Sequence, residues 1–68
     1  MPKKIRELKA MLRKEGFTWQ PGKGSHTRWR HPLAEREVVL SGKDGRDARR
    51  YQEEQVAAQI EVVRRRRG

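Results

Sequence analysis

The fold is decided by the stretch KGSHTRWRHP, residues 23–32 of the chain. It joins a glycine-containing turn to a run, His26 to His31, that is long enough to pair back on the preceding residues as a β-hairpin. Trp29 sets the phase of this run, because a chain with only four aromatic residues needs its tryptophan side chains in the core. The stretch therefore predicts the second strand of an antiparallel sheet, with Trp29 facing inward.

Alternation along this strand divides its polar side chains between two faces. Thr27 and His31 share the inward side with Trp29. The open face carries the other three side chains: His26, Arg28 and Arg30. The two histidines thus lie on opposite faces and cannot share a substrate, so we interpret His31 as structural and His26 as available for chemistry.

The segment before the hairpin predicts a helix from Pro2 to Glu15. Pro2 suits a first-turn position, and Gly16 suits the residue just past the end. Apolar side chains recur on one face: Ile5, Leu8, Met11 and Leu12. Lys3 and Lys4 at the helix start oppose the helix dipole, so they either bind phosphate or form a solvated helix end.

Two further short segments alternate as strands of the same sheet. The first, Phe17 to Gln20, is expected to face the core with Phe17 and Trp19. The third strand, Glu37 to Leu40, is short enough to allow either phase. We prefer the phase that exposes Val39 and buries its two neighbours.

The C-terminal third predicts a loop over residues 41–45 and then a helix from about Ala48 to Arg65, capped by Asp47. The core-facing side of this helix is expected to carry Tyr51, Gln55, Val56, Ile60 and Val63. Residues 64–68 are low in complexity, so we expect a frayed, solvated basic tail, with contact to a partner as the alternative.

These elements predict an α+β fold of order α-β-β-β-α, with a three-stranded antiparallel sheet and both helices on one face. The helices share a face because neither can bury its apolar stripe alone. Residues 1–68 are expected to form a single domain, since a chain this short supports only one small core. The other face of the sheet is left open to water or to a partner.

Composition narrows the classes of function. The chain has no cysteine, which excludes disulfides and thiolate metal sites. No long apolar run is present, so we expect a cytoplasmic protein without a membrane partner. A core this small leaves no room for a deep cavity, and we therefore expect no small-molecule substrate.

Charge points to a polyanionic partner. Eighteen basic and nine acidic residues give a net charge of +9. Residues 1–33 carry nine basic and two acidic residues, a net +7, whereas residues 34–68 carry only +2. The N-terminal half therefore makes the positive field that would attract nucleic acid. The alternative is that the charge only keeps a small domain soluble.

Several segments together resemble a known family. They are a basic helix start, Glu15-Gly16-Phe17, Lys23-Gly24-Ser25-His26, Trp29 and His31-Pro32. In this combination the chain resembles the HicA toxins of bacterial and archaeal toxin-antitoxin pairs, from Lys3 through the second helix. The likeness is weakest over residues 41–48 and 51–53, which indicates a subgroup.

The resemblance implies a fold like a double-stranded-RNA-binding domain and an endoribonuclease that cleaves mRNA. The family needs no metal or cofactor, and a cognate HicB-like antitoxin covers the active site. The essential histidine of the family falls on His26.

The residues themselves support similar chemistry. RNA cleavage without a metal needs a general acid or base, and histidine titrates closest to neutral pH. Arg28 and Arg30 lie about 7 and 14 Å along the strand from His26, a spacing suited to neighbouring phosphates. We therefore predict His26 as catalytic, with these RNA-binding residues: Lys3, Lys4, Lys23, Gly24, Ser25, Arg28 and Arg30.

Alternatives stay open at this point. A non-catalytic RNA-binding module would use the same basic sheet face, with His26 as an ordinary surface residue beside a turn. A DNA-binding regulator is disfavoured because no helix pair is joined by a short turn. Trp19 and Trp29 could stack on bases, although core positions are preferred for both.

Overall fold

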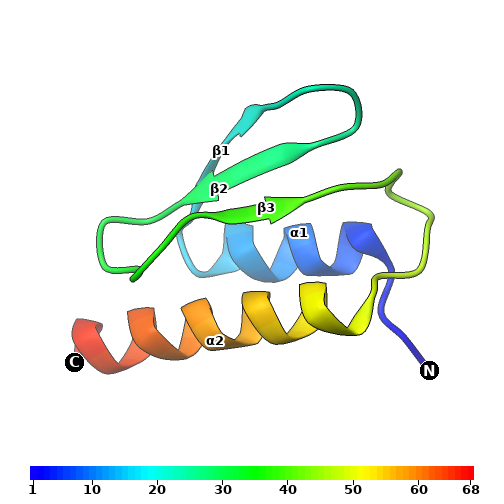
Figure 1. Cartoon of the computed structure of the whole chain (residues 1–68). Coiled ribbons are helices and arrows are strands. Elements are labelled where there is room, and N and C mark those ends of the chain that lie inside the picture. Colours follow the sequence, from blue (N-terminus) through cyan, green and yellow to red (C-terminus); the bar gives the residue numbers. More distant parts are fainter.

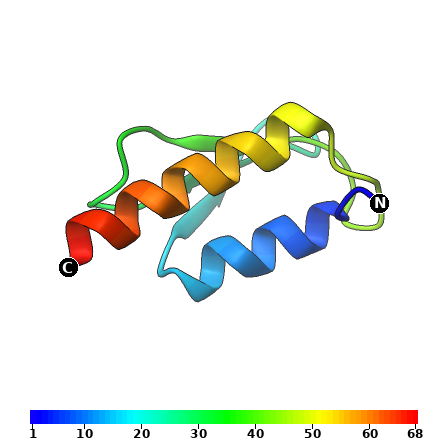
Figure 2. The same cartoon turned by 90° about the horizontal axis from the view of Figure 1, so that it is seen from below.

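Five elements follow one another in the order expected from the sequence. They are α1 (Ile5–Lys14), β1 (Thr18–Pro21), β2 (Thr27–Arg30), β3 (Val38–Leu40) and α2 (Arg50–Arg67). The structure is a computed structural model that describes all residues, 1–68. Strand order in the sheet is β1-β2-β3, and both pairs are antiparallel. Figure 1 shows both helices on one side of the sheet, and Figure 2 shows that they run in the same direction beneath it. The predicted α+β fold is confirmed.

Strand register confirms the phase set by Trp29. This residue lies opposite Trp19 on β1 and opposite Val38 on β3. Val38 and Leu40 are buried and Val39 is exposed, so the preferred phase of the third strand is also correct. One face of the sheet therefore packs on the helices, and the other is open.

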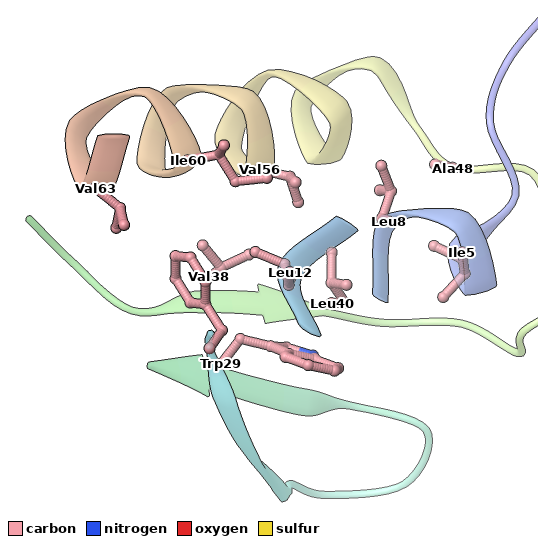
Figure 3. Close-up of a cluster of buried hydrophobic side chains, with 11 residues drawn as sticks. Ile5, Leu8, Leu12, Trp29, Val38, Leu40, Ala48, Val56, Ile60 and Val63 are labelled. Carbon is pink, nitrogen blue, oxygen red and sulfur yellow. The ribbon is translucent and has the colours of Figure 1, made fainter. Parts of the chain in front are cut away.

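Trp29 lies at the centre of the core. It has no solvent-exposed surface, and its indole Nε1–H donates to Thr27 Oγ1 at 2.8 Å, so burial leaves its polar atom satisfied. The guanidinium of Arg13 lies 5.4 Å from the centre of the indole ring. Figure 3 shows Trp29 and the other buried side chains between the sheet and the helices. They come from both helices, from β3, and from two residues outside the elements, Phe17 just before β1 and Ala48 just before α2, and β1 itself contributes none. The full set is Ile5, Leu8, Leu12, Phe17, Val38, Leu40, Ala48, Val56, Ile60 and Val63.

The prediction that Trp19 lies in the core is wrong. Its ring stacks on Trp29, with 6.0 Å between centres, but the residue is 46% exposed. β1 is an edge strand, so Trp19 has a neighbouring strand on one side only. Its ring thus covers Trp29 rather than being enclosed itself.

The first helix begins later than predicted. Pro2 is exposed and lies outside α1, which starts at Ile5. The backbone N–H of Lys4 donates to Glu7 Oε1 at 2.9 Å and closes the helix start. At the other end, Gly16 follows the helix with a positive φ of 92°, as the sequence suggested.

The residues before α1 are held by the connection between β3 and α2, residues 41–49. The N–H of Ile5 donates to the carbonyl of Arg46 at 2.9 Å, and the N–H of Ala48 donates to the carbonyl of Lys3 at 2.7 Å. This pairing explains why Lys3 and Lys4 are not part of the helix, and the backbone of Lys4 is extended. It also brings the start of the chain beside the start of α2 (Figure 1).

Asp47 does not cap the second helix as predicted. Its carboxylate Oδ1 lies 2.5 Å from Lys4 Nζ, and the backbones of the two residues form an isolated antiparallel bridge. α2 accordingly begins at Arg50, two residues later than expected. The Asp47 side chain therefore pairs with the N-terminal segment instead of capping α2.

The buried face of α2 contains a polar residue that the apolar pattern missed. Tyr51, predicted to face the core, is 58% exposed, while Gln52 is buried. Gln52 Oε1 accepts the N–H of Arg49 at 2.8 Å, and its Nε2 donates to the carbonyl of Ser41 at 3.1 Å. Because its amide is satisfied on both sides, Gln52 closes the helix start and joins it to the residue that follows β3.

The expected fraying of residues 64–68 is not observed. α2 continues to Arg67, and Arg64 Nη2 lies 2.7 Å from Glu15 Oε2. Arg67 Nη2 also donates to the backbone carbonyl of Glu15 at 2.8 Å. The hydrogen bond from Arg64 lowers the pKa of Glu15 against the opposing effect of its burial. The basic end of α2 is thus bound to the end of α1.

Replacing Glu15 with Gln should lower the melting temperature by several degrees at neutral pH. Because its folded pKa is lowered, Glu15 stabilises the protein above the ordinary glutamate pKa of about 4.3. This stabilisation disappears as the pH falls through the lowered value. Thermal unfolding of both proteins, followed by circular dichroism at about pH 7 and about pH 3, should show a gap that narrows in acid.

The matched control is Glu61→Gln, since Glu61 is exposed and meets Arg65 only at 4.0 Å. It should melt within about a degree or two of the parent. An equal gap between Glu15→Gln and the parent at both pH values would contradict the assignment.

Candidate functional site

His26 lies at the end of a turn between β1 and β2 that the backbone holds on both sides. Its carbonyl accepts the N–H of Gly22 at 2.8 Å, and its own N–H donates to the carbonyl of Lys23 at 3.1 Å. The side chain is exposed and makes no hydrogen bond within the chain. The turn therefore fixes the backbone of His26 while its imidazole stays free.

Two glycines make this turn possible. Gly24 has a positive φ of 62°, a conformation that other residues rarely adopt. At Gly22, an added Cβ would lie 3.2 Å from the Cβ of His26. A side chain at Gly22 would therefore push His26 away from its position.

Ser25 joins the turn to the β3–α2 connection. Its Oγ accepts the N–H of Gly42 at 3.1 Å. Both residues line a hollow of about 180 Å³, whose walls also include Arg46 and Arg49. Neither of these arginines lies within 4 Å of a carboxylate. Sequence analysis missed both, because the low net charge of residues 34–68 concealed them.

Arg28 and Arg30 lie on the open face, as predicted, but both are bound by one carboxylate. Arg28 donates through Nε to Glu37 Oε1 and through Nη2 to Oε2, each at 3.2 Å. Arg30 Nε donates to the same Oε2 at 2.7 Å. The hydrogen bonds from Arg30 and Arg28 lower the pKa of Glu37. The strand register could have predicted this contact. Val39 pairs with Arg28 in the antiparallel sheet, so Glu37, two residues before Val39, falls opposite Arg30.

The predicted lysines also differ in their partners. Lys4 is paired with Asp47, whereas the Nζ atoms of Lys3 and Lys23 have no carboxylate within 4 Å. Lys3 lies on the segment that pairs with the β3–α2 connection, at the end of the molecule where Ser25 contacts Gly42. Of the cations predicted from the sequence, Lys3 and Lys23 are thus the ones with free charges.

His31 is separated from His26, as the alternation predicted. It is half-buried, and its ring lies 5.1 Å from the ring of Phe17. Its Nδ1 accepts the N–H of Leu33 at 3.0 Å, which fixes the turn after β2. These contacts fit a structural role.

Other kinds of site are not visible in the fold. No three side chains among histidine and the acidic residues come together in a group that could hold a metal ion. Neither helix is both long enough and apolar enough to cross a bilayer.

Comparison with known families shows which protein family the chain belongs to. The family model described as HicA toxin of bacterial toxin-antitoxin matches residues 5–62, which include all three strands and the His26 turn. The chain belongs to the HicA toxin family. Searches of the curated proteins and of the solved structures gave no match. The resemblance seen in the sequence is thereby confirmed, and this HicA toxin is one member of a toxin-antitoxin pair.

Proposed function

We propose that this HicA toxin is a metal-independent endoribonuclease that cleaves mRNA, with His26 as its general acid or base. The observation that carries the proposal is the exposed imidazole of His26 on a turn fixed by two backbone hydrogen bonds. A catalytic group must be held in place while its reacting atom stays accessible, and this turn meets both requirements.

The turn offers the groups that cleavage through the 2′-hydroxyl needs. A base removes the 2′-hydroxyl proton, the oxygen attacks the adjacent phosphorus, and the bond to the 5′-oxygen breaks as that oxygen gains a proton. Histidine can exchange such a proton near neutral pH. The backbone N–H groups of Gly24 and Ser25 donate to no acceptor within the chain. They are therefore available to bind the phosphate oxygens as negative charge develops.

Unpaired cations extend from the turn to the neighbouring connection and suit the flanking phosphates of the RNA. Ser25 links the two segments, so the cations belong to one end of the molecule. None of them has a carboxylate partner within 4 Å: Lys23, Lys43, Arg46 and Arg49. RNA affinity should consequently fall steeply as the salt concentration rises.

The partner of the toxin follows from the same surface. We propose that a cognate HicB-like antitoxin covers the His26 turn and thereby excludes RNA. A positively charged surface of this kind favours an acidic partner. An open reading frame for a small acidic protein beside the toxin would support this pairing.

The test is incubation of the purified toxin with end-labelled RNA in excess EDTA. We expect discrete cleavage products, because no step in the mechanism uses a divalent ion. The matched control is an all-deoxy oligonucleotide of the same sequence, which must stay intact since it lacks the attacking 2′-hydroxyl. RNA that is retarded but uncut would show that the protein is a non-catalytic RNA-binding module, and equal cleavage of both strands would contradict the mechanism.

A further inference from the structure

We propose that Glu37 competes with RNA for Arg28 and Arg30, and that it thereby sets how tightly the open sheet face binds phosphate. This inference rests on the proposed function, because it concerns the RNA affinity of the same surface. It assigns a role to a residue that lies outside the His26 turn and has the opposite charge to the ligand.

The geometry of Glu37 resembles that of a bound phosphate. Arg28 contacts the carboxylate with two nitrogens, Nε and Nη2, one to each oxygen at 3.2 Å. Arg30 adds a third hydrogen bond through its Nε at 2.7 Å. A forked guanidinium binds two oxygens of a phosphate in the same way. The carboxylate therefore occupies the place that a phosphate group of RNA would take.

The two arginines and Glu37 are accessible to a phosphate group of RNA. The side chains of Arg28 and Arg30 are 45% and 61% exposed, and that of Glu37 is 28% exposed. Arg28 and Arg30 alternate along β2 with the buried Thr27 and Trp29, so they lie on the sheet face that the helices leave open, and Glu37 contacts them there. Exposed ion pairs contribute little to stability, so replacing the carboxylate by a more highly charged phosphate costs the fold little.

Glu37 also lowers the positive charge of the open sheet face. Glu37 holds both arginines, so the local charge of the three groups is +1 rather than the +2 that the arginines alone would give. The bonds from the arginines keep the pKa of Glu37 low, so the carboxylate stays ionised at neutral pH. RNA must displace it before both arginines can bind phosphate.

The experiment compares RNA binding by Glu37→Gln and by its parent. Both carry His26→Ala so that the RNA stays intact, and dissociation constants are measured at several salt concentrations. We expect about three- to tenfold tighter binding near 0.1 M salt, because two cations become available to phosphate. The slope of log K against log salt should steepen by about 0.7 for each added phosphate contact.

The matched control is Glu35→Gln, which removes the same charge two residues away. The Glu35 carboxylate has no basic partner within 4 Å, so its loss should change affinity by less than about twofold. The gain from Glu37→Gln should disappear when Arg28 and Arg30 are both replaced by Ala.

Each result decides a different point. If Glu37→Gln binds no tighter than Glu35→Gln, the competition does not exist. If it binds more weakly, Glu37 positions the arginines instead of blocking them, which also overturns the inference. A parent protein that binds no RNA at all would refute the proposed function itself, and the inference with it.

Discussion

His26→Ala should reduce RNA cleavage by at least about 100-fold and remove growth arrest when the toxin is expressed without its antitoxin. The reason is that alanine can neither accept the 2′-hydroxyl proton nor give one to the leaving oxygen. Stability should not change, because the imidazole is exposed and makes no hydrogen bond in the chain. Cleavage rates, the circular-dichroism spectrum and the melting temperature of both proteins test this together.

His31→Gln is the matched control for that experiment. His31 packs on Phe17 and accepts the N–H of Leu33, so its replacement should lower the melting temperature. The folded variant should still cleave RNA at close to the parent rate. If His26→Ala cleaved as fast as the parent, or if His31→Gln were the inactive variant, the assignment of the catalytic histidine would be wrong.

Trp29→Ala should destabilise the fold by about 3–5 kcal/mol. Trp29 is fully buried, stacks on Trp19 and donates a hydrogen bond to Thr27, so the truncation leaves a cavity and removes one hydrogen bond from the core. Small domains have roughly 5–15 kcal/mol of stability in total, and one this short is expected near the lower end. Urea unfolding should therefore show a much lower midpoint or no folded baseline.

Trp19→Ala provides the comparison, because it removes the same side chain from the opposite position on the neighbouring strand. Trp19 is 46% exposed, so its truncation removes much less buried surface. Its unfolding midpoint should lie between those of the parent and Trp29→Ala. A cooperative transition of Trp29→Ala at the parent midpoint would show that the core does not depend on this residue.

The sheet could be predicted because its apolar residues are few and alternate. Once Trp29 faces inward, Thr27 and His31 must share its side, and the structure agrees. What the pattern could not reveal is the burial of polar residues. Gln52 and Glu15 can be buried because tertiary contacts satisfy them: Gln52 bonds to Ser41, 11 residues earlier, and Glu15 bonds to Arg64, 49 residues later. Apolar periodicity contains no information about such pairs.

The candidate site likewise has a part that the sequence predicted and a part that it did not. Its turn was predictable from glycine spacing, since Gly24 has the positive φ that the turn requires. The partners of its cations were not predictable, because they are set by tertiary contacts. Lys4 meets Asp47 across 43 residues, and Arg28 meets Glu37 across a loop. Counting charges along the sequence therefore predicted a polyanionic partner but did not distinguish paired cations from free ones.

The β3–α2 connection also limits how the length of this chain can vary. Surface loops usually tolerate insertions, because their ends are the only fixed points. Here the backbone is fixed at four separate positions within the loop: Gly42 binds Ser25, Asp44 binds Arg6, Arg46 binds Ile5, and Ala48 binds Lys3. An added residue between any two of these positions would shift either the His26 turn or the start of α1. The number of residues in this segment is therefore fixed by the His26 turn on one side and by the first helix on the other, even at positions where the side chain is exposed and unpaired.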